Sequence, residues 1–233
     1  MATPLIQAEQ TFSSGTVQVA LLELFTSEGC SSCPPVEQWL GHYRDDPALW
    51  LEVVPVAWHV NYWDRLGWKD RYATREFTAR QYAYASVWRS NSVYTPCLVR
   101  NGLEWRQGGT IRPAATKAGQ LTVVWSGSGL ALVRFTPPPD SSPDDYTVTI
   151  ALLGGSISSQ VQKGENAGRE LHHEFVALRT VEAGLTRDGE EGYVTSITLP
   201  YSNLTSTPRQ AVAAWVTRSG ELAPLQATGG WLN

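Results

Sequence analysis

The sequence has no cluster of basic residues, no long apolar stretch and only three cysteines. Its 18 Lys and Arg residues are outnumbered by 22 Asp and Glu residues, and the formal net charge is -4. Electrostatic attraction to nucleic acid or to an anionic membrane surface is therefore weak. No apolar run approaches the roughly 20 residues with which a helix crosses a bilayer. We expect neither nucleic acid binding nor membrane insertion.

The first 16 residues also lack the basic and apolar regions of a signal peptide. The sequence leaves the compartment open. We expect a periplasmic or secreted protein if a leader has been removed, and a cytoplasmic protein otherwise. The oligomeric state is equally open.

Three cysteines are too few for a framework of structural disulfides in a chain of 233 residues. Two of them form the motif Cys30-Ser31-Ser32-Cys33, whose spacing brings two sulfurs within reach of a disulfide. Zinc sites use the same spacing, but the chain has no second C-x-x-C pair to complete such a site. The motif therefore indicates redox chemistry, and we predict no resident metal and no cofactor.

The first 60 residues alternate between apolar runs and a helical pattern. Residues 17–25 form an apolar run interrupted only by Gln18 and Glu23, a helix is predicted from Cys30, and residues 51–59 predict a second strand. Two strands joined by a helix favour a parallel pair with a right-handed crossover. The motif then lies at the start of the helix, where free backbone N–H groups stabilise a thiolate. Cys30 is the expected nucleophile and Cys33 the resolving thiol.

The remaining segments predict two domains. Residues 69–90 have apolar residues at helical spacing and predict an inserted helical segment. Beyond residue 121, short strand-like runs alternate with clusters of Gly, Pro, Ser and Asp, which is typical of a β-sandwich. We predict an N-terminal extension over residues 1–16, an α/β domain over 17–121 and an all-β, sandwich-like domain over 122–233.

The order of strand, C-x-x-C helix, strand, helix and Thr-Pro strand is similar to that of thioredoxin, so the resemblance implies that the α/β domain is thioredoxin-like. It also implies that the Thr95–Pro96 peptide bond is cis, faces the two cysteines and holds an extended substrate. An ordinary trans proline at a strand start is the alternative. Glu23 resembles the buried acid that exchanges protons with the resolving thiol in that fold, but lies one residue further away. A structural, hydrogen-bonded Glu is the alternative.

Several longer motifs extend this resemblance. They are ELFTSEGCSSCPP at 23–35, HVNYWDRLGWKD at 59–70, Arg80-Gln81, Tyr94-Thr95-Pro96, and GENAGR at 164–169 with His172. Together they resemble the thioredoxin-like domain-of-unknown-function family numbered 1223, over nearly the whole chain. Cys97 departs from the family, which commonly has Gln at this position. Residues 164–169 are predicted to form a polar turn with no catalytic role, whose charged residues could hold the β-domain against the α/β domain.

The segment 59–70 follows the carboxyl end of the second predicted strand, the edge at which parallel sheets collect ligands. We predict that His59 exchanges protons with Cys30 and that Tyr62, Trp63 and Trp68 form an aromatic wall that binds the substrate. The alternative is an aromatic loop whose side chains serve packing alone.

These residues favour a thiol–disulfide oxidoreductase whose partner is a protein thiol or disulfide. One alternative is a module that binds copper or zinc through Cys30, Cys33, His59 and, if it reaches them, Cys97. A buried and inert Cys97 is the favoured interpretation of that residue. The other alternative is a non-catalytic interaction protein that keeps the fold and a structural disulfide. The dipeptide between the cysteines does not predict the redox direction.

Overall fold

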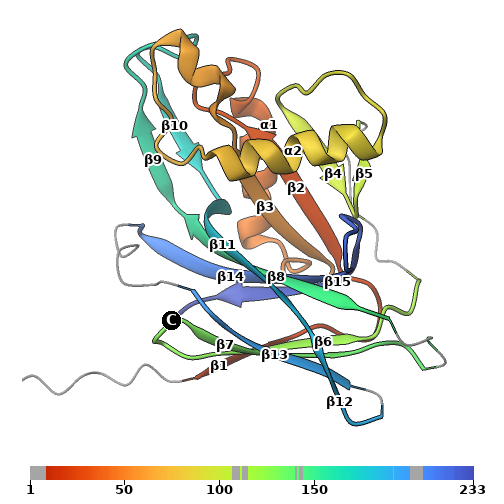
Figure 1. Ribbon diagram of the computed structural model, residues 1–233. Helices are drawn as coiled ribbons and strands as arrows, with labels where there is room; N and C mark the ends of the chain where they lie inside the picture. Colours follow the sequence, from red (N-terminus) through yellow and green to blue (C-terminus); the bar gives the residue numbers. More distant parts are fainter. Residues whose placement is uncertain are drawn as a thin grey trace, which may run out of the picture.

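The computed structural model describes residues 9–106, 111, 115–139, 141, 144–190, 192–199 and 207–233. Within these residues the protein is mostly β, with two large sheets and one two-stranded sheet (Figure 1). None of the helices in the described residues has the length and apolar character needed to span a bilayer.

The largest sheet contains eight strands and draws on both halves of the chain. In spatial order they are β15 (Pro224–Trp231), β14 (Arg209–Arg218), β8 (Tyr146–Gly155), β11 (Val176–Gly184), β3 (Val53–His59), β2 (Ala20–Thr26), β4 (Cys97–Arg100) and β5 (Leu103–Glu104). β2 and β3 pair in parallel, as expected for two apolar strands joined by a helix.

The two halves of the chain join where β11 pairs in parallel with β3, through Val176 and Ala57. The Ala57 amide also donates a hydrogen bond of 2.8 Å to the carbonyl of Phe175. The predicted fold class, an α/β thioredoxin-like domain followed by an all-β domain, is therefore wrong: the protein is mostly β, and its main sheet is continuous across both parts. The apolar sequence of β3 predicts burial of both faces, but it does not indicate which distant strand pairs with its edge. The predicted domain boundaries stay predictions.

The second large sheet packs against one face of β8 and β14. In spatial order its strands are β1 (Gln10–Ser13), β6 (Gln120–Trp125), β7 (Leu130–Thr136), β13 (Gly192–Thr198) and β12 (Thr186–Asp188). Because side chains alternate along a strand, Ile150 and Leu152 of β8 lie in the core shared with this sheet. Ala151 and Leu153 lie in the other core, which includes residues of both α-helices.

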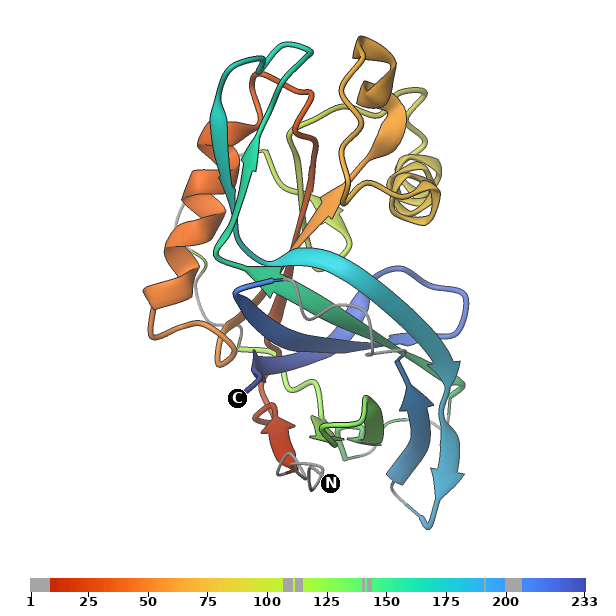
Figure 2. The same cartoon turned by 90° about the vertical axis from the view of Figure 1, so that its left-hand side faces the viewer.

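Two α-helices lie on opposite faces of β2 and β3 (Figure 2). Helix α1 (Pro34–Gly41) begins directly after Cys33, with prolines in its first turn, where no intrahelical N–H bond is lost. Helix α2 (Arg75–Val87) falls inside the segment predicted to be helical and begins after Thr74, whose side-chain oxygen accepts a hydrogen bond of 3.1 Å from the Phe77 amide.

Two 3-10 helices and one β-hairpin complete the part of the molecule around α1. The 3-10 helix η1 (His42–Asp45) continues from α1, and η2 (Asn61–Leu66) follows β3. Strands β9 (Ile157–Gln160) and β10 (Glu170–His173) form a hairpin that lies beside α1 (Figure 2). This hairpin brings the second half of the chain to the start of α1.

Candidate functional site

Cys30 and Cys33 form a disulfide at the start of α1. Cys33 is the N-cap residue, and its carbonyl accepts the Val36 amide at 3.0 Å. Both cysteines are fully buried, but Ser31 and Ser32 between them are exposed. The Ser32 hydroxyl lies 3.3 Å from Cys30 Sγ. The disulfide is therefore buried directly beside an exposed serine. It also lies next to helix N–H groups that favour a thiolate after reduction.

Residues 161–169, which connect β9 to β10 and which we call the cap loop, hold the cysteine segment in place. Buried Asn166 donates two side-chain hydrogen bonds of 2.9 Å, to the carbonyls of Glu28 and Cys30. Glu165 accepts the Ser31 amide at 3.0 Å and the Ser31 hydroxyl at 2.7 Å. The predicted polar turn thus lies against the disulfide. The sequence suggested that charged residues of this turn hold the two parts of the chain together, but it did not indicate Asn166, because 136 residues separate it from Cys30.

Trp63 connects the cysteine segment to the Thr-Pro strand. Its indole N–H donates a hydrogen bond of 2.8 Å to the Thr95 hydroxyl. A Cβ atom on Gly29 would lie only 3.0 Å from Trp63 Cβ, so glycine next to Cys30 permits the close approach. The Thr95–Pro96 peptide bond is cis, as the resemblance implied. The structure therefore brings Trp63, Thr95 and the backbone beside Cys30 together.

The other two residues of the predicted aromatic wall contact different groups. The Tyr62 hydroxyl donates to the Gln81 side chain at 3.3 Å, and burial raises the pKa of Tyr62 to about 12. The Trp68 indole donates to Glu28 at 2.6 Å, on the side of the cap loop. Tyr62 is thus tied to α2, and Trp68 supports a buried carboxylate.

Glu23 is fully buried, but it faces α2. Its carboxylate accepts hydrogen bonds from Trp58 at 3.0 Å and from Arg80 at 2.6 Å, and a further short one from the Tyr84 hydroxyl. Thr26, three residues further along β2, instead contacts Glu37 of α1 at 2.5 Å. Alternation along the strand therefore places Glu23 on the sheet face opposite α1. The structure brings it to Arg80 rather than to the cysteines.

His59 lies under the start of α1 and is fully buried. Its Nδ1 is 2.6 Å from Asp70 Oδ2, and its ring contacts those of Tyr72 and His173. Burial alone would lower the pKa of His59, but the Asp70 carboxylate outweighs it and the pKa is raised. Among the described residues, the hydrogen bonds and ring contacts of His59 do not include Cys30.

His59 belongs to a group that we call the buried His–carboxylate cluster: Glu28, Glu37, His59, Asp70 and His173. His173 Nδ1 makes a short hydrogen bond to Glu37, and its Nε2 lies 3.4 Å from Glu28. Burial opposes protonation of His173, but Glu37 and Glu28 raise its pKa to about 10. Sequence reasoning missed Glu37 and His173. These two residues are 136 positions apart, so no local sequence pattern indicates that they meet. The one local sign is a histidine in a strand whose residues alternate between exposed and buried.

Cys97 is buried at the start of β4, opposite Phe25 of β2. Burial raises the pKa of its thiol to about 11. Among the described residues, the His, Cys, Asp and Glu side chains that lie close enough to share a metal ion are Glu37, His59 and His173. The structure therefore does not bring Cys97 to the disulfide and His59.

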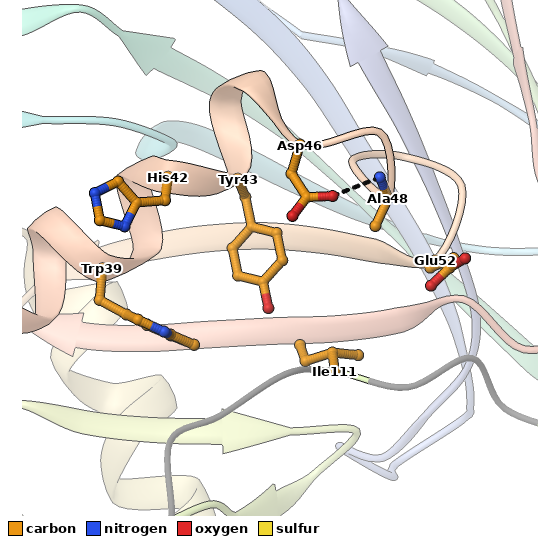
Figure 3. Close-up of a pocket in the computed structure, with 7 residues that line it drawn as sticks. All are labelled: Trp39, His42, Tyr43, Asp46, Ala48, Glu52 and Ile111. Atoms are coloured by element: carbon orange, nitrogen blue, oxygen red, sulfur yellow. Dashed lines mark hydrogen bonds between the residues drawn. The ribbon is translucent and has the colours of Figure 1, made fainter.

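A surface pocket of about 490 Å³ lies beyond the other end of α1 (Figure 3). It is lined by Trp39, His42, Tyr43, Asp46, Ala48, Glu52 and Ile111. The Asp46 carboxylate closes one side by accepting the Ala48 amide at 2.8 Å. No predicted site residue lines this pocket.

The sequence matches the family described as protein of unknown function (DUF1223) over residues 21–217. No curated protein matches it. Solved structures with a similar fold include protein AGR_C_4864 from Agrobacterium tumefaciens, with a TM-score of 0.65 and 22% identity over 93% of this chain and 96% of that chain. HBP35 of Porphyromonas gingivalis has a TM-score of 0.61 and 13% identity over 94% of this chain and 76% of that chain. These similarities concern the fold alone.

Glu23→Gln tests whether Glu23 serves Arg80 or the cysteines. We expect destabilisation of about 3–5 kcal/mol, because the largely buried Arg80 loses its charge partner. Urea unfolding measures this, and Glu76→Gln on the exposed face of α2 is the control, expected to change stability by about 0.5 kcal/mol at most. We expect thiol exchange at the disulfide to keep its wild-type pH profile. A changed pH profile with unchanged stability would contradict this.

Alkylation of Cys97 tests the burial of its thiol. With a pKa of about 11, the thiol is neutral below that pH, and at about pH 8 only roughly one molecule in a thousand carries the thiolate. We expect iodoacetamide to label the native protein at least about 100-fold more slowly than the same protein in urea, with the native rate rising toward pH 11. Mass spectrometry of digests measures the label. Equal rates in both states would rule out the buried thiol.

Proposed function

The chain belongs to the DUF1223 family of proteins of unknown function, and we propose that it is a thiol–disulfide oxidoreductase that works through Cys30 and Cys33. One observation carries the proposal: the disulfide lies at the N-terminus of α1, covered by exposed serines and a polar loop rather than by apolar core. A purely structural disulfide needs no helix N-terminus, whereas a reactive one gains thiolate stability there.

The proposed exchange begins with attack of a partner thiolate on Cys30 Sγ. A bond forms between the partner sulfur and Cys30, the Cys30–Cys33 bond breaks, and its electron pair leaves on Cys33 Sγ, which takes up a proton. A second partner thiolate attacks the mixed disulfide and releases Cys30. Two partner thiols become one disulfide, and the protein gains two electrons and two protons. The reverse sequence oxidises the protein and reduces a partner disulfide.

Thr95 and Pro96 are the proposed substrate-binding edge. Both are partly exposed, and Trp63 ties Thr95 to the backbone beside Cys30. An extended partner segment that binds along this edge would carry its sulfur toward Cys30. His59 is not assigned a proton-transfer role, because its contacts are with the buried His–carboxylate cluster.

Access to the disulfide depends on the cap loop in this proposal. Both sulfurs are buried, so a partner reaches Cys30 only after the loop moves. The loop is held there by polar contacts of Glu165 and Asn166, and most of its own side chains are exposed. A segment of this kind opens more readily than the surrounding strands.

Glutathione exchange tests the proposed reaction. Native protein is equilibrated in mixtures of reduced and oxidised glutathione, quenched by alkylation and analysed by mass spectrometry. We expect Cys30 and Cys33 to interconvert between disulfide and dithiol, and Cys33→Ser to accumulate a mixed disulfide on Cys30. Cys97→Ser is the matched control and should exchange like the wild type. Exchange no faster than global unfolding would instead make the disulfide structural, as in a non-catalytic interaction protein.

Asn166→Ala tests the gating by the cap loop. It removes two hydrogen bonds to the cysteine segment, worth about 1–2 kcal/mol in total, so reduction by dithiothreitol should become about 5- to 30-fold faster. Gln162→Ala is the control, since its side chain bonds only within the hairpin in the described structure. Rates are compared after urea unfolding has excluded an equal loss of global stability. An unchanged reduction rate would show that the cap loop does not limit access to the disulfide.

A further inference from the structure

We propose that Glu37, His59 and His173 form a buried binding site for one transition-metal dication of the zinc class. This site uses no cysteine, so it goes beyond the proposed thiol chemistry. Its three residues come from α1, the end of β3 and β10, which the fold brings together under the start of α1.

The distances suit a shared ligand. One donor atom from each of the three side chains lies within 4.8 Å of those from the other two. All three residues are buried, with exposed fractions of 6% for Glu37, 0% for His59 and 1% for His173. Donors about 2.0–2.2 Å from a zinc ion lie closer together than this limit, so small side-chain rotations complete the site.

The His59 ring carries an independent sign of a missing ligand. Its Nε2 is buried without a hydrogen-bond partner among the described residues, whereas Nε2 of His173 has Glu28 3.4 Å away. Buried polar atoms in native proteins almost always have a partner, so the His59 nitrogen requires an explanation. A metal ion bound by Nε2 of His59 would supply the partner that this nitrogen lacks.

The second ring nitrogen of each histidine faces a carboxylate in the way that metal-binding histidines require. His59 Nδ1 is 2.6 Å from Asp70, which leaves Nε2 for the metal. His173 Nε2 lies 3.4 Å from the unpartnered Glu28 Oε1, which leaves Nδ1, already beside Glu37. The proposed ligands are therefore His59 Nε2, His173 Nδ1 and the Glu37 carboxylate, with Asp70 and Glu28 orienting the rings.

Charge favours a dication at this place. With neutral imidazoles, the buried carboxylates of Glu28, Glu37 and Asp70 would carry three negative charges in a region without solvent. A dication neutralises two of these charges. It takes the place of the protons on the His59 and His173 rings, which neutralise them when no metal is bound. Two imidazoles and one carboxylate are donors that suit Zn²⁺ and leave a fourth position for water.

A surface groove reaches one of the three proposed ligands. A groove of about 410 Å³ lies between α1 and β10 and is lined by Pro34, Glu37, Arg169 and Leu171, among others. Glu37 thus reaches both the groove and the cluster, so an ion that enters the groove meets its first ligand at the wall.

The test is Zn²⁺ titration of chelator-treated, oxidised full-length protein by isothermal calorimetry. We expect one ion per chain, and at least about 100-fold weaker binding in His59→Gln and in His173→Gln. Glu76→Gln, an exposed carboxylate of α2 outside this groove, is the control and should bind like the wild type. Stoichiometric binding undiminished in both histidine variants, or no stoichiometric binding by the wild type, overturns the proposal.

A second measurement covers the case in which the histidine variants do not fold. Zinc-edge X-ray absorption of the loaded wild type should show nitrogen and oxygen neighbours with imidazole scattering and no sulfur. Sulfur neighbours, or binding lost in the Cys30→Ser, Cys33→Ser double variant, would overturn the site. The zinc titration uses the oxidised protein, so its result can be interpreted even if the thiol–disulfide proposal fails. Conversely, failure to bind zinc would leave the glutathione exchange experiment unaffected.

Discussion

The pairing of β11 with β3 is the interaction on which the rest of the site depends. The Ala57 amide bonds the Phe175 carbonyl, and two residues before Phe175 lies His173, at the end of β10. This pairing fixes the hairpin beside α1, so His173 reaches Glu37 and the cap loop reaches Cys30. Without it, the first half of the chain would hold the cysteines but neither the cap loop nor the second histidine.

Strand alternation along β2 places two buried polar side chains, Glu23 and Thr26, on opposite faces of the sheet. Glu23 faces α2 and pairs with Arg80, whereas Thr26 faces α1 and bonds Glu37. Each buried charge therefore has a partner on its own side of the sheet, which is the condition under which such charges are tolerated. A shift of β2 by one residue would place Glu23 toward α1 and leave Arg80 unpaired, so this pair also opposes register errors.

Local sequence patterns predict the elements around the cysteines well. The apolar runs predict β2 and β3 as a parallel pair, the prolines after Cys33 agree with the start of α1, and the resemblance implied the cis bond before Pro96. The fold class failed because β3 gains its second neighbour from β11, more than 100 residues later, and no local pattern indicates that pairing. The contacts of Asn166 with Cys30 and of His173 with Glu37 were not predicted for the same reason. Glu23 has the contacts of the structural alternative, and the sequence left both roles open because an acid in an apolar strand signals burial but not which face it takes.

The segment from Glu28 to Cys30 is held from two sides, which links the cluster to the disulfide. Asp70, which is hydrogen-bonded to His59, accepts a hydrogen bond of 2.9 Å from the Glu28 amide. On the other side, the Asn166 side chain donates hydrogen bonds of 2.9 Å to the carbonyls of Glu28 and Cys30. Moving the cap loop releases these two carbonyls and the Ser31 amide bonded to Glu165, while the Asp70 bond still anchors the Glu28 amide. Cys30 can therefore be uncovered while its backbone stays in register with α1. The proposed thiol–disulfide exchange needs a cover that moves and a nucleophile that stays fixed, because exchange requires access while thiolate stabilisation requires the sulfur to stay at the helix end.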